Sequence, residues 1–284
     1  MTLKFYFVVS IVLFTRISSS YKPVVLLHGI LSAHEEMEIL ANYITTAHPG
    51  TEIHNIALYE KSSSADTSLW TQLHGIVAKI RAILKNDTGV HMVCHSQGGL
   101  LCRAMIETVV GHNVHNFVSL SAPMMGQFGL TDYIRTMFPN YTEDHLYLVM
   151  YTKEVQEHFS VSNYWHDPFH VKDYDEYCSF LISLNNAFQP GYRDNFLRLK
   201  KLVLIGGKDD GVITPWQSSQ FAFYDQQLSV IPMEQQEVYT NDKFGLKTLH
   251  KKGGIKIYSI DGVEHTHWRH NQSVFDCCIE PWLD

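Results

Sequence analysis

The 284-residue sequence contains little charge and no excess of basic residues. Charged residues make up 18% of it, and 22 Lys and Arg stand against 29 Asp and Glu, a formal net charge of −7. A surface that neutralises several phosphates needs clustered Lys and Arg, so the sequence argues against nucleic-acid binding. Apolar residues make up 45%, which is ordinary for a folded globular protein and too much for a disordered chain.

Long hydrophobic runs are missing after the first 20 residues. Residues 5–14 form an apolar run that follows a lysine and precedes small residues. The run is too short to cross a bilayer, so it predicts a signal peptide over residues 1–20, cleaved near Ser20. A retained N-terminal anchor is the alternative. For residues 21–284 we expect one soluble domain without a membrane span. Passage through the secretory pathway agrees with three N-x-S/T glycosylation triplets, at Asn86, Asn140 and Asn271.

Cysteine is scarce, and no pair has the C-x-x-C spacing of a metal site, so we expect no metal. An oxidising compartment favours disulfides, and an odd number of five leaves at least one cysteine free or intermolecular. Cys94 and Cys102 flank one strand–turn–helix unit and are the preferred pair. Cys178 is expected to pair with Cys277 or Cys278, with the remaining one of these neighbours a buried thiol.

Short apolar segments alternate with helical patterns along the chain. The segments expected to be strands are residues 23–27, 52–59, 90–94, 117–120, 202–205 and 255–260. Apolar residues at helical spacing lie between them, over 37–44, 69–83 and 100–110. This alternation predicts an α/β fold, a mostly parallel sheet with helices on both faces. The aromatic-rich stretch of about 124–200 breaks the rhythm, and we expect it to be a cap inserted over the strand ends.

One expected strand runs directly into Cys94-His95-Ser96-Gln97-Gly98. A serine on a sharp strand-to-helix turn is exposed at the top of a sheet, as in the G-x-S-x-G turn of α/β-hydrolases. Cys94 replaces the first glycine of that pattern with another small residue. The alternative is an ordinary helix N-terminus that Ser96 caps. We predict that Ser96 is the nucleophile of an α/β-hydrolase.

A serine nucleophile needs a base, and the base needs an orienting acid. In this fold the chain order is Ser, then Asp or Glu, then His. Asp210 follows the fifth expected strand and is preferred to Asp209, although the pair could simply form a turn. His265 follows the last expected strand and is preferred to His267 and His270.

The tetrahedral intermediate of acyl transfer needs hydrogen-bond donors for its oxyanion. We expect one donor to be the backbone N–H of Gln97, directly after the nucleophile. The other is expected in the loop after the first strand, at the backbone N–H of Ile30. The alternative for that His-Gly-Ile segment is a simple turn after a strand.

With these residues in place, the chain resembles the palmitoyl-protein thioesterase family, most closely its second, lysosomal type. The resemblance covers nearly all of the chain after the signal peptide. It rests on several long motifs: Tyr21-Lys22-Pro23-Val24-Val25, His48-Pro49-Gly50-Thr51, Ser96-Gln97-Gly98-Gly99-Leu100, Asn163-Tyr164-Trp165-His166-Asp167-Pro168, Asp209-Asp210-Gly211-Val212-Ile213-Thr214-Pro215-Trp216, Phe244-Gly245-Leu246-Lys247-Thr248-Leu249 and Ile279-Glu280-Pro281-Trp282-Leu283.

The resemblance implies an activity and a location. The family's catalytic serine, aspartate and histidine fall on Ser96, Asp210 and His265. The implied reaction is hydrolysis of long-chain fatty acyl thioesters, such as palmitoyl-CoA or S-palmitoyl cysteine, through an acyl-serine, without a cofactor and in the lysosome. The family's Cys-x-Ser-Gln-Gly form also accounts for Cys94. Tyr258 stands where the family has a further cysteine, so the pairing near the C-terminus stays open.

Two other functions remain open from the residues alone. An oxygen-ester lipase or carboxylesterase would use the same three residues. A non-catalytic lipid-binding protein on a hydrolase scaffold would not need all three. We expect the acyl chain to lie in an apolar groove under the cap. The sequence does not determine chain-length preference, the form of the thioester or the oligomeric state.

Overall fold

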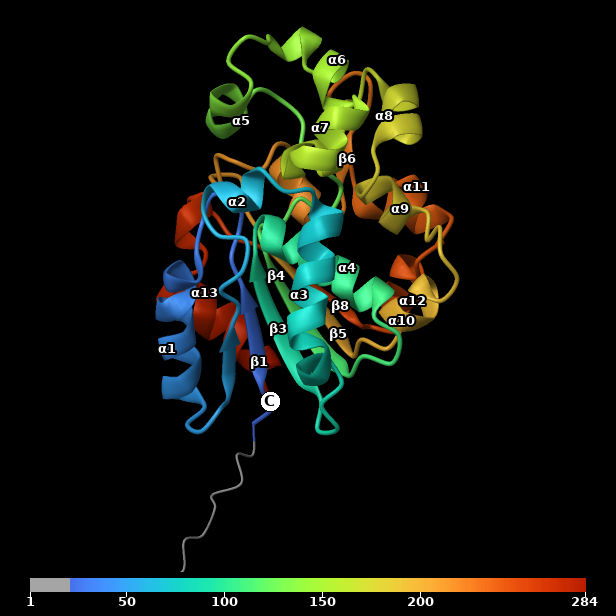
Figure 1. Cartoon of the computed structure of the whole chain (residues 1–284). Helices are drawn as coiled ribbons and strands as arrows, with labels where there is room; N and C mark the ends of the chain where they lie inside the picture. The colour runs from blue at the N-terminus through green and yellow to red at the C-terminus, as the bar shows by residue number, and fades with distance from the viewer. Residues whose placement is uncertain (1–20) are drawn as a thin grey trace, which may run out of the picture.

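The computed structural model describes residues 21–284, so the predicted signal peptide lies outside the described residues. Six strands form one sheet in the order β2-β1-β3-β4-β5-β8, and every neighbouring pair is parallel (Figure 1). Their bounds are β1 Val24–Leu27, β2 Ile53–Asn55, β3 Val90–His95, β4 Val114–Leu120, β5 Lys201–Gly206 and β8 Ile255–Ser259. A separate antiparallel ribbon joins β6 (Phe223–Tyr224) and β7 (Val230–Ile231). The predicted parallel sheet is confirmed.

Side chains along the strands alternate between two hydrophobic cores. In β1, Val25 and Leu27 belong to one core, whereas Val24 and Leu26 belong to the other. Successive side chains of a strand point to opposite faces, so both faces of this sheet are buried. All four of these side chains are at most 1% exposed. Burying each one stabilises the fold by about 1.5–3 kcal/mol.

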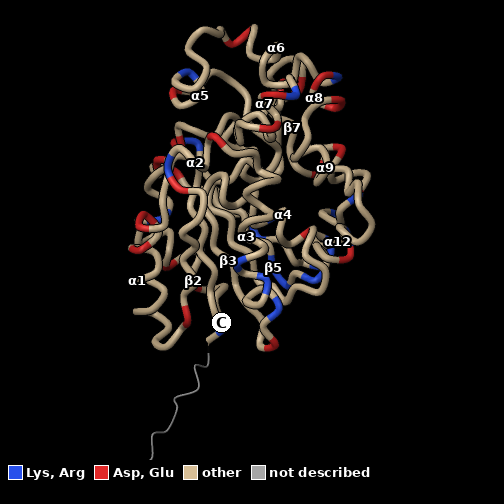
Figure 2. The backbone as a smooth tube through the Cα atoms, in the orientation of Figure 1, with Lys and Arg blue, Asp and Glu red and all other residues tan. Residues whose placement is uncertain are grey.

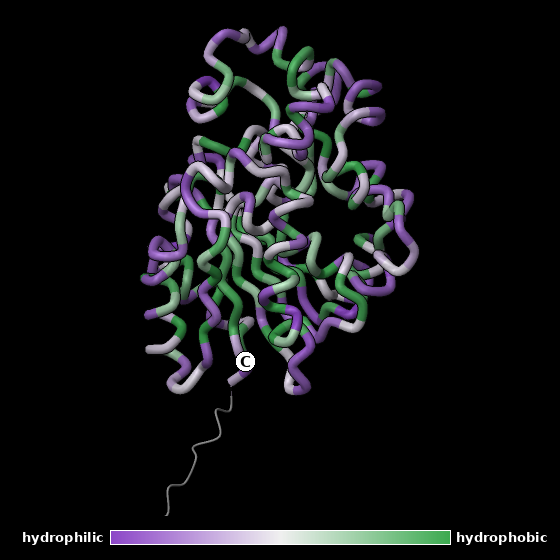
Figure 3. Tube along the Cα trace, viewed as in Figure 1, coloured by the Kyte–Doolittle hydropathy of each residue, from purple (hydrophilic) through white to green (hydrophobic). Residues whose placement is uncertain are grey.

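Helices cover both faces, as predicted. Helices α3 (Leu69–Leu84), α4 (Gln97–Thr108), α10 (Tyr192–Phe196) and α12 (Leu246–Lys251) pack on one face (Figure 1). Helix α1 (Glu38–Ala47) and the C-terminal turns with α13 (Gln272–Val274) pack on the other. In α3 the apolar residues recur at helical spacing, and the Ser68 hydroxyl caps the helix by accepting from the Thr71 N–H at 3.4 Å. Figure 3 shows hydrophobic residues along the central strands, and Figure 2 shows charged residues on the outer turns.

The stretch between β4 and β5 forms short helices instead of a βαβ unit. They are α5 Asp132–Met137, α6 Tyr147–Met150, α7 Lys153–His158, α8 Val171–Tyr177, α9 Leu181–Asn185 and α10. Figure 1 places α5 to α8 beyond one end of the sheet, whereas α10 contacts α4 beside it. In residues 21–284 no helix has both the length and the apolar character needed to cross a bilayer.

The second strand is shorter than its sequence pattern predicts. β2 pairs with β1 only over Ile53–Asn55, although residues 52–59 were expected to be extended. Beyond it the chain turns back toward β1, where the Leu58 carbonyl lies 3.2 Å from His28 Nε2. Tyr59 adopts a φ of 52°, which no strand residue does. The turn leads into α2 (Ser62–Ala65), a four-residue helix beside the strand ends.

Candidate active site

Ser96 occupies the sharp turn between β3 and α4. Its backbone angles are φ 54° and ψ −131°, outside the regions that L-residues normally adopt, and such strain costs on the order of 1–3 kcal/mol. The turn depends on small neighbours. A Cβ on Gly98 would lie 2.3 Å from the His28 carbonyl oxygen, and a Cβ on Gly29 would lie 2.7 Å from the Ser96 Cβ. Only glycine permits these approaches, which bring the loop after β1 against Ser96.

The three predicted catalytic residues meet at the carboxyl ends of β3, β5 and β8. His265 Nε2 lies 2.9 Å from Ser96 Oγ, and His265 Nδ1 lies 2.9 Å from Asp210 Oδ2. All three residues are buried, with exposures of 4% for Ser96, 2% for Asp210 and 8% for His265. The separations match those of a nucleophile, its base and an orienting acid.

Asp210 receives more hydrogen bonds than the sequence predicted. Its Oδ2 accepts from the Ser121 hydroxyl at 2.6 Å and from Trp268 Nε1 at 2.7 Å, and its Oδ1 accepts from the Ile213 N–H at 2.8 Å. Burial raises the pKa of Asp210, but the hydrogen bonds from His265, Ser121 and Ile213 outweigh it and lower the pKa to about 2. The carboxylate therefore stays charged beside the imidazole.

The competing residues lie elsewhere. Asp209 Oδ2 accepts from the Gly262 N–H at 2.7 Å and thus holds an exposed turn. His267 Nδ1 lies 3.9 Å from a Glu264 carboxylate oxygen, and His270 Nε2 lies 3.3 Å from a backbone carbonyl. None of these three side chains contacts Ser96, so the geometry favours the residues that were preferred.

His95, next to the nucleophile, is a site residue that the sequence did not identify. Its ring centroid lies 4.7 Å from that of His265. Arg269 Nη1 donates to His95 Nδ1 at 3.3 Å, so the ring proton is on Nε2, which donates to the His265 carbonyl at 2.8 Å. Burial, followed by the nearby His265, lowers the pKa of His95 to about 3. A neutral His95 holds the His265 backbone without placing a second cation beside it.

The two expected oxyanion donors border the nucleophile. Gln97 follows Ser96 directly, and Ile30 follows Gly29, whose Cα lies against the Ser96 side chain. Among residues 21–284, neither the Ile30 nor the Gln97 backbone N–H donates to a protein acceptor.

The predicted Cys94–Cys102 disulfide is present and joins the end of β3 to α4 across the Ser96 turn. The other cysteine prediction is wrong. Cys277 and Cys278 bond to each other, and Cys178 is a buried free thiol. The reason is their position, because Cys178 and Cys278 lie in the cores on opposite faces of the sheet. Burial raises the pKa of the Cys178 thiol to about 12, which disfavours the reactive thiolate form.

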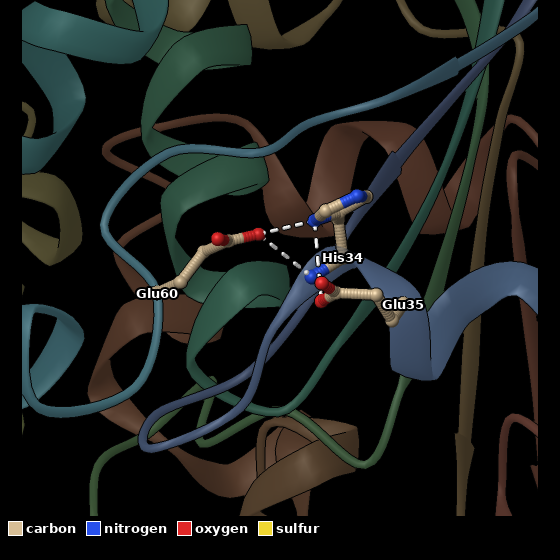
Figure 4. A group of neighbouring side chains, drawn as sticks. All are labelled: His34, Glu35 and Glu60. Carbon is tan, nitrogen blue, oxygen red and sulfur yellow. Dashed lines mark hydrogen bonds and ion pairs between the residues drawn. The ribbon is translucent and has the colours of Figure 1, made fainter.

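A cluster of His34, Glu35 and Glu60 lies where the loops after β1 and β2 meet (Figure 4). Each residue offers one atom that could bind a metal, and these atoms lie within 4.8 Å of one another. His34 Nδ1 contacts Glu60 Oε1 directly, and the His34 backbone N–H donates to the same oxygen at 3.0 Å. The Glu60 hydrogen bond raises the pKa of His34. An ion pair that ties the two loops accounts for this cluster.

A cleft of about 400 Å³ opens between the segment after β4 and the residues that follow β6. Its lining includes apolar Met125, Ile182, Phe188 and Val238 together with polar and charged side chains. Ser96, Asp210 and His265 are not among the lining residues. Phe188 is 57% exposed at its rim.

The glycosylation candidates differ in exposure. Asn140 is exposed, whereas Asn86 and Asn271 are half-buried. The Asn86 side-chain oxygen accepts from the Thr88 hydroxyl at 2.7 Å, and that of Asn271 caps α13 by accepting from the Val274 N–H at 3.2 Å. Asn140 is therefore the most accessible of the three side chains.

The parallel sheet, the strained serine turn after β3, and an acid and a histidine after later strands define the α/β-hydrolase class. Aspergillus fumigatus lipase B shares the fold, with a TM-score of 0.52 and 10% identity over 89% of this chain and 50% of that chain.

The sequence relatives place the chain within that class. The family model for palmitoyl protein thioesterase matches residues 23–265. Lysosomal thioesterase PPT2 of Rattus norvegicus is 46% identical over 93% of this chain and 88% of its own length. The Homo sapiens protein of the same name is 46% identical over 93% and 89%. The Drosophila melanogaster homolog is 37% identical over 94% of each. The chain belongs to the palmitoyl protein thioesterase family.

Proposed function

We propose that this protein is a serine hydrolase that cleaves long-chain fatty acyl thioesters, such as palmitoyl-CoA or S-palmitoyl cysteine. The observation that carries the proposal is the buried chain of contacts from Ser96 Oγ through His265 to Asp210, with 2.9 Å at each step. Family membership supports the thioester as substrate, because the relatives are named thioesterases.

The first half-reaction forms the acyl-enzyme. His265 Nε2 takes the Ser96 proton as the hydroxyl oxygen attacks the thioester carbonyl, and Asp210 stabilises the imidazolium. The carbonyl oxygen becomes an oxyanion, which the N–H groups of Ile30 and Gln97 stabilise. The C–S bond then breaks, and the thiol leaves with a proton from His265.

The second half-reaction restores the enzyme. His265 deprotonates a water molecule, which attacks the Ser96 ester through a second oxyanion at the same donors. The fatty acid leaves as Ser96 regains its proton. Side chains and backbone groups of this chain, with water, supply every step.

The acyl chain is assigned to the cleft beneath the segment of about 124–200, which we propose as a cap on a single domain of residues 21–284. Support comes from Met125, which lines the cleft and belongs to the loop after β4, next to the strand that ends at the nucleophile. Apolar lining residues suit an acyl chain, and the volume is that of small-ligand pockets.

Thiol release from palmitoyl-CoA and from an S-palmitoyl cysteine peptide tests the proposal, with Ser96→Ala as the control. Wild-type protein should turn over at least one thioester, and Ser96→Ala should lose at least about 10³-fold in kcat while staying folded. An oxygen ester of equal chain length runs in parallel. Turnover of that ester alone would make the protein a lipase or carboxylesterase. No turnover and no labelling of Ser96 by a fluorophosphonate would leave only a lipid-binding protein.

We propose that the protein reaches the lysosome through the secretory pathway. The relatives are named lysosomal thioesterases, which supports the destination. The signal-peptide pattern and the three glycosylation triplets support the route. A C-terminally tagged full-length chain should co-localise with a lysosomal marker, and peptide N-glycosidase should lower its apparent mass. A cytosolic, unglycosylated product would contradict both parts.

A further inference from the structure

We propose that Ser64, in α2, is a positioning residue that holds both halves of the oxyanion hole in place. The inference rests on the proposed function and concerns a residue outside the catalytic chain of contacts. Ser64 is 1% exposed. Its hydroxyl makes two hydrogen bonds, its carbonyl accepts two, and its backbone N–H donates to the Lys61 carbonyl at 3.1 Å. These bonds reach the residue after Ile30 and the side chain of Gln97.

The hydroxyl holds the loop that carries Ile30. Ser64 Oγ accepts from the Leu31 backbone N–H at 2.7 Å and donates its one proton to the Lys61 carbonyl at 2.6 Å. The Leu31 N–H belongs to the Ile30–Leu31 peptide, so this bond holds the peptide plane next to the one that carries the Ile30 N–H. The Lys61 N–H returns a bond to the Ser32 carbonyl at 2.7 Å, which closes the connection between the two loops.

Leu31 needs this support because its backbone is strained. Its φ of 56° lies in the left-handed region, a backbone conformation that is energetically costly for a bulky residue such as leucine. Its side chain is 46% exposed, so packing contributes little to holding the conformation. The partly buried hydrogen bond from its N–H to Ser64 Oγ helps to hold this conformation.

The backbone carbonyl of Ser64 holds the Gln97 side of the oxyanion hole. Gln97 Nε2 donates to the Ser64 carbonyl at 2.9 Å, and Gln72 Nε2 donates to the same oxygen at 2.8 Å. Both glutamines are 1% exposed. The orientation of the Gln97 amide is fixed, because the reverse would set its oxygen against the Ser64 carbonyl. One buried residue thus sets the spacing between the two oxyanion donors.

The His34–Glu60 ion pair joins the same loops farther out (Figure 4). Its side chains are 31% and 29% exposed, so solvent weakens its hold on the loop. The pair contacts neither Leu31 nor Gln97 through its side chains. Ser64 differs from this ion pair because it bonds both to Leu31, which follows one donor residue, and to the side chain of Gln97, the other donor residue.

Ser64→Ala tests the hydroxyl connection, with Ser63→Ala as the matched control. Ser63 is the exposed neighbour in α2, and within residues 21–284 its hydroxyl bonds only to the Glu60 carbonyl, at 3.0 Å. Ser64→Ala should lower kcat about tenfold with KM within about twofold, since a positioned donor acts chiefly in the transition state. Ser64→Thr, which keeps a hydroxyl, should recover most of the loss. Ser63→Ala should match the wild type.

Two inhibitors of equal chain length distinguish positioning of the oxyanion donors from a merely structural role of Ser64. A C16 trifluoromethyl ketone forms an oxyanion adduct with Ser96, whereas palmitate binds without one. Ser64→Ala should weaken the ketone about tenfold and palmitate less than twofold. Equal weakening of both, or an unchanged kcat, would overturn the proposal. If Ser64→Ala does not fold, Gln97→Leu, which keeps the backbone N–H, must show the same selective loss.

The test does not depend on the thioester as substrate. Rates on 4-nitrophenyl palmitate are measured beside palmitoyl-CoA, so the ratio between Ser64→Ala and the wild type is obtained for any acyl hydrolase. Wild-type turnover of the oxygen ester alone would refute the thioesterase function and still test Ser64. Normal thioester turnover in Ser64→Ala would refute the role of Ser64 and leave the function standing.

Discussion

Asp210 shows how much a single side chain depends on its neighbours. Its two oxygens accept from His265, Ser121, Trp268 and the backbone after β5. Charge-assisted bonds of this kind are among the stronger ones in proteins, and each also fixes the direction of the carboxylate. The imidazole consequently has one orientation, with Nδ1 toward the acid and Nε2 toward Ser96.

Asp210→Asn should lower kcat by about 10³–10⁴-fold with little change in KM. The amide would present an N–H or a weaker acceptor to His265 and thereby favour the wrong tautomer. Steady-state kinetics on palmitoyl-CoA measures the effect. Asp209→Asn is the matched control, because this exposed neighbour accepts a hydrogen bond from the turn at Gly262 and lies outside the contacts of His265. A larger loss of kcat in Asp209→Asn than in Asp210→Asn would show that Asp209 is the orienting acid.

The lowered pKa of Asp210 predicts how stability depends on pH. Its folded pKa of about 2 lies below the ordinary value of 3.8, so the folded state favours the charged form. The resulting stability is fully present above about pH 4 and is lost as pH falls through about 2. The free energy of unfolding should therefore drop by about 2 kcal/mol more in the wild type than in Asp210→Asn. Urea denaturation from pH 5 to 2 compares them, and parallel curves would contradict the assignment.

The strand–turn–helix unit of β3, Ser96 and α4 is the central element of the site. Buried strand residues bring the chain to the sheet edge, glycines allow the close approach of the loop after β1, and the disulfide links the two arms. The helix begins at Gln97 and not near Leu100, because the sharp turn at Ser96 already directs the chain into its first turn. Strand β3 and helix α4 thus keep Ser96 in its strained backbone conformation.

Removing this disulfide should destabilise the fold without removing the catalytic groups. Cys94→Ala with Cys102→Ala should lower the free energy of unfolding by about 2–3 kcal/mol, as expected for closing a loop of this length. Thermal unfolding with and without reductant measures it. Reductant should lower the melting temperature of the wild type by more than that of the double variant. An equal effect of reductant on both melting temperatures would show that the Cys94–Cys102 disulfide does not contribute to stability.

At the scale of the whole molecule, the site is assembled from segments that are far apart in the chain. Ser96, Asp210 and His265 follow different strands, and the parallel sheet brings the carboxyl ends of those strands to one edge. Helices α5 to α8 lie beyond that edge, and residues between β4 and β5 form one wall of the cleft. The position of the cleft relative to the catalytic residues therefore depends on the topology of the entire sheet.

Narrowing the cleft should change chain-length preference. Val238→Trp adds bulk to a lining residue, so it should raise KM for palmitoyl-CoA by about tenfold and leave hexanoyl-CoA within about twofold. Leu148→Trp is the control, since Leu148 is 55% exposed on α6 and does not line the cleft. An unchanged KM for the long chain in Val238→Trp would place the acyl chain elsewhere.

The alternation of strands and helices, the serine turn and the order of the proposed catalytic residues could be predicted from the sequence. Periodicity and local turn chemistry encode these features within short windows. The chain's family followed from its motifs and was confirmed by the comparisons. Strand ends were less certain, as in β2, because pairing at a sheet edge depends on the neighbouring loop.

Which distant groups meet became clear only from the three-dimensional arrangement of the chain. Ser121 and Trp268 on Asp210, His95 beside His265, and Ser64 between the oxyanion donors carry no local signal, since each acts through a residue far along the chain or on another element. The cysteines show the same limit. Spacing sufficed for Cys94 with Cys102, whereas Cys178 was separated from its expected partners by the sheet itself. Contacts between distant segments depend on the order and register in which the strands pair. The sequence specifies that arrangement only through the packing of the whole chain.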